Sequence, residues 1–210
     1  MKIGQRGRTF AALIVVSLGL LTALAFVVLP AGARSPGPPH GWDWSSAAPG
    51  AAVSLDAHAG ALAAHDGVDG ASVREIAPTG GANGTLKLLM GRNVRGDRCL
   101  AKIGAIVQTS YACLTDLTQG DRALVVFPSF GGSNMNVVDR ATLLGVARDD
   151  VAGLTVQTIG GSVHPVTLNR WRAFAYTADT AAGVPTAITA YGGGGGVLQT
   201  YQLDATPPAV

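Results

Sequence analysis

The sequence predicts an all-β fold for most of its 210 residues. From Ser72 onward, short runs of apolar and β-branched residues alternate with polar ones, and Gly, Pro, Asn or Asp separate the runs. This pattern is typical of strands joined by tight turns. The two cysteines of the chain, Cys99 and Cys113, lie within this region, and an even cysteine count in a small exported domain indicates a disulfide.

The first 33 residues determine where this fold is expected to lie. Lys2, Arg6 and Arg8 precede an apolar run over residues 10–29, and an apolar helix of about 20 residues spans roughly 30 Å, the thickness of a bilayer's hydrocarbon core. Basic residues before such a run favour a cytoplasmic amino terminus, so we expect the rest of the chain to be extracytoplasmic. The small-x-small sequence at residues 31–33 is typical of a signal-peptidase site. Residues 1–33 are therefore predicted to be either a cleaved signal peptide or a transmembrane anchor through residues 10–29.

The charge balance bears on the partners of the exported part. The chain carries 15 Lys and Arg residues against 13 Asp and Glu residues. Lys2, Arg6 and Arg8 lie in residues 1–33, which hold no acidic residue, so residues 34–210 keep 12 basic residues against 13 acidic ones, a net charge of −1. Because a near-neutral domain has no positive field to hold nucleic acid, this class of partner is excluded.

Residues 34–70 are predicted to form a spacer ahead of a β-domain at residues 71–205. Residues 34–52 are rich in Pro, Gly, Ser and Ala, a composition that favours an extended linker. Trp42 and Trp44 are exceptions, and they either rest at the membrane interface or pack onto the domain. A short helix is expected over residues 53–66, with Ser54 as its N-cap.

The connections between the expected strands differ in kind. Pro128 is expected to end a strand, and residues 130–136 to form an open loop. Gly160-Gly161 has the pattern of a two-residue hairpin turn. The glycines at 192–196 are expected to form a looser, mobile hairpin loop, because neither a helix nor Lys-Ser/Thr follows them as a phosphate-binding loop requires. The expected strands cover residues 72–76, 85–90, 98–103, 106–113, 124–127, 142–147, 154–159, 162–168, 173–177, 186–191 and 197–203.

Together these elements predict one compact domain of the immunoglobulin-like β-sandwich type, with about seven to ten strands. A small β-barrel is the alternative architecture. Since the strands alternate, each sheet can have one buried face.

The spacing of the cysteines leaves their register open. If Gly104-Ala105 were a two-residue turn, Cys99 would face residue 110, three residues short of Cys113, whereas a disulfide needs Cβ atoms about 3.5 to 4.5 Å apart. Either the turn is wider and centred near Ile106, or a bulge intervenes, or the two strands do not form a simple hairpin. We expect the bond nonetheless, and loop closure should stabilise the fold by roughly 3 kcal/mol.

The order of segments is informative as a whole. A basic start, an apolar leader and a Pro/Gly-rich spacer precede a Gly-x-x-Cys…Cys strand pair and a final module. The residues of that module are Leu144-Gly145-Val146-Ala147, Asp150-Val151, Leu154-Thr155-Val156, Gly161, Phe174, Ala187-Ile188-Thr189-Ala190-Tyr191 and Gly196-Val197. Over roughly residues 72–203, this arrangement resembles uncharacterised exported β-rich proteins of actinobacterial type. The resemblance implies location and fold class, and it provides no activity or site residue to transfer.

Sequence signals for catalysis and metal binding are weak. Ser133 lies in a Gly-Gly-Ser-Asn-Met sequence that lacks the second Gly of a nucleophile elbow, and both cysteines are expected to be bonded rather than nucleophilic. The spacing of the candidate metal ligands matches neither zinc nor calcium signatures. No catalytic residue, cofactor or metal is therefore predicted. The candidate ligands are His58, His65, Asp66 and Asp69.

The other ionisable residues are interpreted as structural or solvated. Asp149-Asp150 is expected to form a turn between strands, and His164 to lie on the surface. A local basic group is expected to be a solvated face, although an anionic wall polymer or lipid headgroup could contact it. Asn83-Gly84-Thr85 fits the N-glycosylation pattern. The basic group consists of Arg92, Arg95, Arg98 and Lys102, and the expected turn residues near the disulfide are Asp97, Asp116 and Asp121.

These observations favour a non-enzymatic cell-envelope module that binds an envelope or wall ligand or acts as a spacer. One alternative is a secreted hydrolase whose site is assembled from residues distant in the sequence. The other is a single-pass membrane sensor that acts through a partner.

Overall fold

The computed structural model describes residues 41–42, 51–79, 86–104, 110–119, 121–132 and 137–204. The predicted leader with its apolar run, residues 34–40 and 43–50 of the predicted spacer, the glycosylation pattern and Ser133 lie outside the described residues. The fold described below belongs to the unit Arg34–Val210. Among its described residues, no helix is both long and apolar enough to cross a membrane.

The described strands form three open antiparallel sheets, here called sheets A, B and C, rather than a closed barrel. Sheet A has the order β1 (Ala51–Ala52), β2 (Val68–Thr79), β3 (Leu86–Asn93), β4 (Arg98–Ile103) and β5 (Ala112–Cys113). Sheet B has the order β10 (Ala173–Ala178), β7 (Arg140–Ala147) and β6 (Leu124–Gly131). Sheet C has the order β12 (Val197–Gln202), β11 (Pro185–Gly192), β8 (Val151–Thr158) and β9 (Val163–Val166). The helices are α1 (Ala57–His65), α2 (Leu114–Leu117) and the 3-10 helix η1 (Ala181–Gly183).

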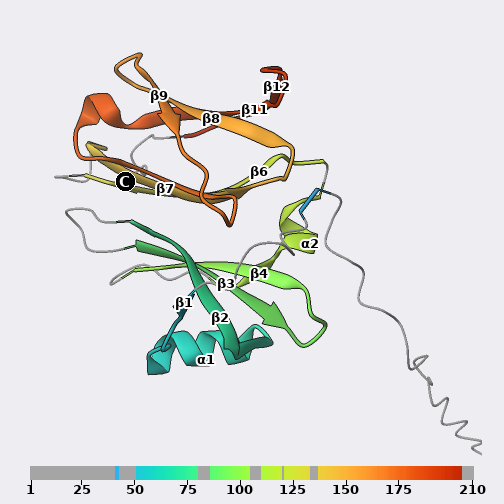
Figure 1. The fold of residues 1–210 in the computed structure, drawn as a ribbon. Helices are drawn as coiled ribbons and strands as arrows, with labels where there is room; N and C mark the ends of the chain where they lie inside the picture. The colour runs from blue at the N-terminus through green and yellow to red at the C-terminus, as the bar shows by residue number, and fades with distance from the viewer. Residues whose placement is uncertain are drawn as a thin grey trace, which may run out of the picture. The chain divides into compact units, whose positions relative to one another are not determined.

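The sheets are stacked, with sheet B between sheets A and C and with α1 on the far face of sheet A (Figure 1). One core cluster joins Ile76, Leu88 and Leu100 of sheet A to Leu144 and Val146 of sheet B. A second joins the opposite face of sheet B to sheet C, and a third joins α1 to sheet A. The all-β sandwich class is confirmed, with more strands than the expected seven to ten.

The central strand β7 explains the stacking. Leu143 and Ala147 pack toward sheet C, whereas Leu144 and Val146, which point the other way, pack toward sheet A. The sequence Leu-Leu-Gly-Val-Ala is continuously apolar, as expected for a strand buried on both faces. Sheet B therefore has two buried faces, whereas the alternating sequence pattern accounted for one buried face in each sheet.

Helix α1 begins later than expected and uses a different cap. The Asp56 carboxylate accepts a hydrogen bond of 2.7 Å from the Ala59 backbone N–H, the usual role of an aspartate N-cap. Asp66 ends the helix as predicted, with Gly67 next to it at a φ of 68°. Ala59 and Ala63, four residues apart on one face, are buried, so the helix covers sheet A with small side chains.

Residues 41 and 42 belong to the core rather than to a free linker. The Trp42 side chain is only 1% exposed and packs among residues of sheets A and B. The Gly41 carbonyl accepts a hydrogen bond of 2.6 Å from the Asp149 backbone N–H, and the Trp42 carbonyl accepts one of 3.2 Å from Arg98. Of the two positions considered for Trp42, packing onto the domain is confirmed.

Two expectations about strand ends are corrected. Strand β6 runs through Pro128 to Gly131, because β6 is an edge strand of sheet B and a proline there removes no ladder bond. The loop between β8 and β9 spans three residues between Thr158 and Ser162, joined by a hydrogen bond of 3.0 Å, and Gly161 adopts a φ of 79°. The glycine hairpin between β11 and β12 is confirmed, and hydrogen bonds between Gly192, Gly195 and Gly196 close it.

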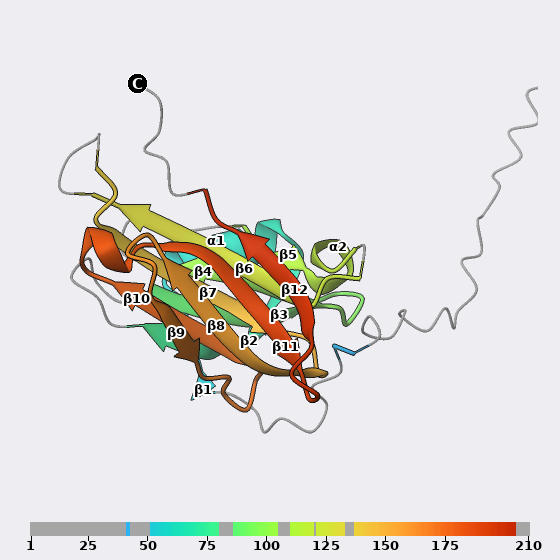
Figure 2. The same ribbon diagram turned by 90° about the horizontal axis from the view of Figure 1, so that it is seen from above.

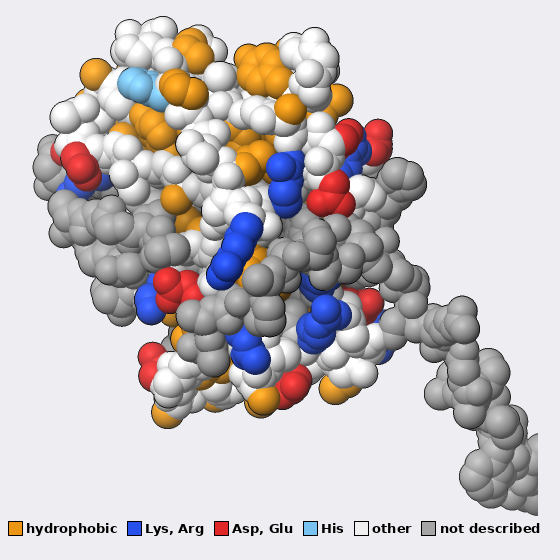
Figure 3. Space-filling model, in the orientation of Figure 1, with side chains coloured by type: hydrophobic (Ala, Val, Ile, Leu, Met, Phe, Trp, Pro, Cys, Tyr) orange, Lys and Arg blue, Asp and Glu red, His pale blue; other side chains and the backbone are white. Residues whose placement is uncertain are grey.

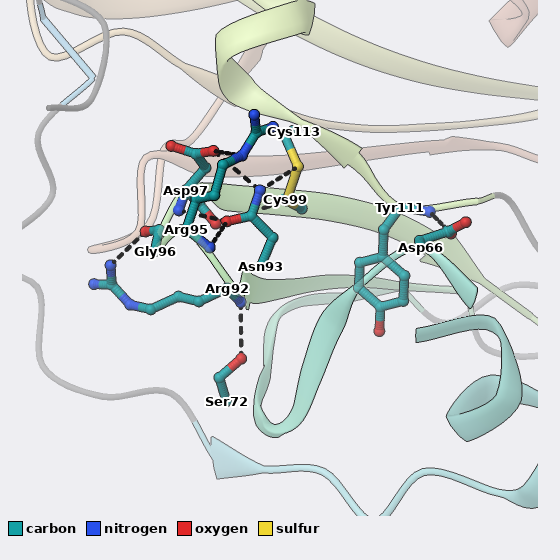
Figure 4. Close-up of a disulfide and its surroundings, with 10 residues drawn as sticks. All are labelled: Asp66, Ser72, Arg92, Asn93, Arg95, Gly96, Asp97, Cys99, Tyr111 and Cys113. Atoms are coloured by element: carbon teal, nitrogen blue, oxygen red, sulfur yellow. Dashed lines mark hydrogen bonds and ion pairs between the residues drawn. A yellow bond between two sulfur atoms is a disulfide. The ribbon is translucent and has the colours of Figure 1, made fainter. Parts of the chain in front are cut away.

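The predicted disulfide is present between β4 and β5, where Cys99 lies directly opposite Cys113 (Figure 4). The pairs Cys99–Cys113 and Leu100–Ala112 centre on residue 106, as the alternative with the wider turn requires. Residues 105–109 themselves lie outside the described residues. Asn93, at the end of β3, supports the bond, because its side-chain N–H groups donate to Asp97 at 3.0 Å and approach the Cys113 sulfur at 3.6 Å.

We expect Gly145→Ala to destabilise the protein by about 1–3 kcal/mol, the usual cost of overpacking a core. A Cβ at Gly145 would overlap the Val125 carbonyl oxygen and the Phe174 ring. Gly153→Ala on β8 is the matched control, because a Cβ there meets no atom within 4 Å. Urea unfolding followed by circular dichroism would measure both variants. Equal midpoints would contradict the tight packing of sheet B.

Replacing both cysteines by alanine should lower the free energy of unfolding by roughly 3 kcal/mol. The free energy of unfolding of the wild type should fall by the same amount when it is measured under reducing conditions. If the oxidised wild type and the Cys99→Ala/Cys113→Ala variant had the same urea midpoint, the disulfide would not stabilise this fold.

Candidate functional site

Sheet C differs from the other sheets in its lack of charge. Residues 151–169 and 180–203 contain no Asp, Glu, Lys or Arg, so none of its strands carries one. In Figure 3 the side chains over this sheet are mostly uncharged, whereas charged side chains gather over the layers below it. The charged residues of sheet A, by contrast, are Asp69, Arg74, Glu75, Lys87, Arg92, Arg98 and Lys102.

The outer face of sheet C carries hydroxyl and amide groups. Ile188 and Val156 point into the core, so the residues that alternate with them point outward. Thr189 pairs with Thr155 on one side and with Thr200 on the other, which sets three hydroxyl side chains in one row across three strands. The view in Figure 2 looks down on this sheet, and no other described element crosses its outer face. We call this surface the uncharged face; its polar side chains are Thr155, Gln157, Thr189, Tyr191, Thr200 and Gln202.

Side-chain hydrogen bonds hold this row in place. The hydroxyl oxygens of Thr189 and Thr200 are 3.2 Å apart, and those of Thr155 and Tyr191 are 3.3 Å apart. Each hydroxyl group is both a donor and an acceptor, so these pairs leave further hydrogen-bonding capacity toward solvent. The strands beneath fix the spacing, because neighbouring strands lie about 4.7–4.9 Å apart.

Apolar side chains are exposed beside both hairpins of the sheet. Ile159 and Val163 flank the β8–β9 hairpin with exposed fractions of 56% and 61%. Val197 and Leu198 follow the glycine hairpin with 62% and 40%. Exposed apolar side chains therefore border the polar centre of the uncharged face, and neither the polar nor the apolar residues there are charged.

A hollow of about 390 Å³ adjoins the sheet between β9 and β10. Tyr176 lines it, and the His164 ring lies 6.0 Å from the Tyr176 ring. Burial raises the pKa of Tyr176, and its hydroxyl donates a hydrogen bond of 2.9 Å to the Gly183 carbonyl. The Tyr176 hydroxyl is thus held by a backbone carbonyl, and among the described residues no hydrogen bond joins the His164 ring to a nucleophile. His164 is exposed, as predicted.

A second hollow, of about 550 Å³, lies at the β7–β8 turn and includes Asp149. Arg148 donates to Asp150 at 2.7 and 2.9 Å and also contacts Asp121. These bonds raise the pKa of Arg148, and they lower the pKa of Asp150 chiefly through the hydrogen bond from Arg148. Arg148 also crowds Gly41, whose added Cβ would lie 2.8 Å from the Arg148 Cγ. The cluster therefore ties the turn to its neighbours, which confirms the interpretation of Asp149-Asp150 as a turn.

Three of the candidate metal ligands, His65, Asp66 and Asp69, do not converge on one point, and the His58 side chain lies outside what the structure describes. His65 contacts Asp66 at 2.9 Å, while the other Asp66 oxygen accepts the Tyr111 backbone N–H at 2.7 Å. Asp69 instead accepts the Ala71 backbone N–H at 3.0 Å. In the part of the chain that the structure describes, no three His, Cys, Asp or Glu side chains form a group suited to a metal ion.

The expected basic group is not one surface. Lys102 is buried between the sheets, donates 2.8 Å to the Pro128 carbonyl, and has a pKa lowered by burial. Arg98 binds the Trp42 carbonyl, Arg92 binds the Gly96 carbonyl at 3.1 Å, and Arg95 pairs with Asp97 at 3.4 Å. These residues support the fold, and the interpretation as a solvated face is wrong for Lys102.

Sequence reasoning missed the uncharged face, although one signal was present. The charge-free stretches 151–169 and 180–203 are visible in the sequence. Which residues within them point outward depends on strand pairing, and the row of Thr155, Thr189 and Thr200 brings together residues from three strands.

Acidification should reveal the Arg148–Asp150 bond. Because the folded-state pKa of Asp150 is lowered, its contribution is full above the unfolded pKa of about 3.9 and is lost as pH falls through the folded value. Asp150→Asn should therefore cost about 1 kcal/mol or less at neutral pH and lose less stability than the wild type below about pH 4. Urea midpoints across this pH range would measure it. The exposed Asp179→Asn is the control, and identical acid profiles for the wild type and Asp150→Asn would contradict the assignment.

Comparison of the chain with protein-family models, with curated proteins and with solved structures finds no match. Its function must therefore be argued from the chemistry of its own surface.

Proposed function

We propose that this protein is a non-enzymatic extracytoplasmic binding module, and that its uncharged face binds an uncharged polysaccharide of the cell envelope. The observation that carries the proposal is the row of Thr155, Thr189 and Thr200 on a sheet without charged residues. The leader sequence and the disulfide support the location, since disulfides persist in oxidising compartments. Anchored and released forms both fit this proposal.

The chemistry of the face fits a neutral sugar polymer. Sugar hydroxyls donate and accept hydrogen bonds, as do the threonine, glutamine and tyrosine side chains of the face. A charged polymer would gain no ion pair there and would lose hydration on contact. Tyr191 is half-buried and adjoins Thr155, so part of its ring is available for apolar contact with a sugar ring.

The rigidity of the sheet supports binding without closure or chemistry. The inner side chains Ile188, Ala190 and Val156 are fully buried, so the outer side chains stand on a packed layer. Pre-organised groups lose little conformational entropy on binding. The hydrolase and sensor alternatives remain hypotheses, and no contact described above favours either.

We also infer an immunoglobulin-like topology for residues 124–202. Numbered in chain order from β6 to β12, the first, second and fifth strands form sheet B, and the remaining strands form sheet C. This division, with the fourth strand beside the third, matches sandwiches in which strand C′ joins strands C, F and G. The strand order supports this inference, and sheet A with α1 is then an addition to the N-terminal side.

Affinity electrophoresis through gels containing soluble neutral polysaccharides would test the proposed function. We expect retardation by at least one glucan, mannan or arabinogalactan and none by a polyuronate. Thr189→Val should weaken binding several-fold, because one hydrogen bond contributes about 0.5–1.5 kcal/mol, and Thr189→Asp should abolish it. Thr177→Val is the matched control, since Thr177 is an exposed strand threonine of sheet B.

Two results would contradict this function. One is a complete lack of retardation by any neutral polymer. The other is retardation that Thr189→Asp leaves unchanged, which would place binding elsewhere on the molecule.

A further inference from the structure

Strand β12 forms one edge of sheet C, and its outer side pairs with no other described strand. An edge strand leaves backbone N–H and C=O groups unpaired, and natural proteins protect such edges with proline, charged residues, short strands or covering groups. β12 extends over Val197–Gln202 and contains neither proline nor a charged residue. Among the described residues, its edge therefore lacks the usual protection.

Each of the other edge strands among the described residues has one of these protections. Pro165 lies in β9 and Pro128 in β6. On β10, the backbone N–H and C=O of Ala173 are both bound by Asn169. The edge strands of sheet A, β1 and β5, are only two residues long each. The contrast singles out β12 as the edge built to accept another strand.

The register with β11 identifies the groups that are available. The Leu203 backbone N–H donates a hydrogen bond of 2.8 Å to the Thr186 carbonyl, and this bonded pair recurs every second residue in an antiparallel ladder. Tyr201 therefore bonds to β11, whereas the backbone N–H and C=O groups of Thr200 and Gln202 point away from the sheet.

We propose that a second copy of this chain pairs with β12 in antiparallel orientation, with a two-fold axis at Tyr201. Thr200 then lies opposite Gln202 of the second copy, and each such pair exchanges two backbone hydrogen bonds. The arrangement is self-complementary, as a symmetric dimer requires. No like charges oppose each other, because β12 carries none.

The dimer would extend the uncharged face. Thr200 and Gln202 lie on the outer side of sheet C, so pairing joins the two faces into one continuous surface with the same chemistry. Two linked surfaces bind one polymer more strongly than either alone. The pairing itself rests on the β12 edge and does not depend on what the face binds.

Cysteine crosslinking of the full-length protein tests this register. The variants Thr200→Cys and Gln202→Cys each add one free thiol, since Cys99 and Cys113 are bonded to each other. Opposed Cβ atoms in an antiparallel pair are about 4.5–5.5 Å apart, within reach of a short bifunctional thiol reagent. We expect crosslinked dimer in the mixture of the two variants and much less in either variant alone. Equal crosslinking in all three samples would overturn the proposal.

A proline substitution provides the second test. Thr200→Pro removes an outward N–H and leaves the bonds to β11 intact, whereas Thr200→Val removes only the hydroxyl group. Sedimentation of the full-length protein should show a dimer for the wild type and Thr200→Val and a monomer for Thr200→Pro. A monomeric wild type, or a dimeric Thr200→Pro, would overturn the dimer. A monomeric wild type that still binds polysaccharide would leave the proposed function standing, so the two failures are distinguishable.

Discussion

The burial of sheet B on both faces is the constraint on which the rest of this fold depends. Leu144 and Val146 pack against sheet A, and Leu143 and Ala147 pack against sheet C, so one strand contributes to two cores. Gly145 lies between them, where the Val125 carbonyl and the Phe174 ring leave no room for a side chain. Because both interfaces share β7, sheets A and C cannot be treated as independent layers.

Two further sets of contacts connect residues 41 and 42 to sheet B and its neighbouring turn. Trp42 fills the interface between sheets A and B. In the β7–β8 turn, Arg148 binds Asp150 of the same turn and also Asp121. Gly41 lies against Arg148 with a φ of 78°, a conformation that favours glycine. Residues 41 and 42 are therefore held by the same centre that holds the sheets together.

Charged residues are unevenly distributed among the sheets. Those of sheet A support the fold, whereas the strands of sheet C, which carry the proposed binding surface, have none. In sheet A, Lys102 binds the Pro128 carbonyl of sheet B, and Arg98 binds the Trp42 carbonyl. Basic residues that resemble a binding group in the sequence therefore support the fold. Sheet C carries no charged residue in its strands, and its hydroxyl groups face outward in register. The candidate surface is therefore distinguished both by the absence of charged residues from its strands and by its outward-facing hydroxyl groups.

The sequence by itself determined the elements whose signals are local. Alternation located most strands, the glycines at 192–196 marked a hairpin, and the two cysteines of the chain left a single possible pairing. Local signals failed where a competing residue was nearby, as for Asp56 over Ser54 at the helix cap, or where sheet position mattered, as for Pro128 on an edge strand. Only the tertiary structure decided that β7 is buried on both faces, that Trp42 enters the core, and that Thr155, Thr189 and Thr200 form one row. The physical reason is that these features arise from pairing and packing between residues far apart in the chain, which local composition and periodicity do not encode.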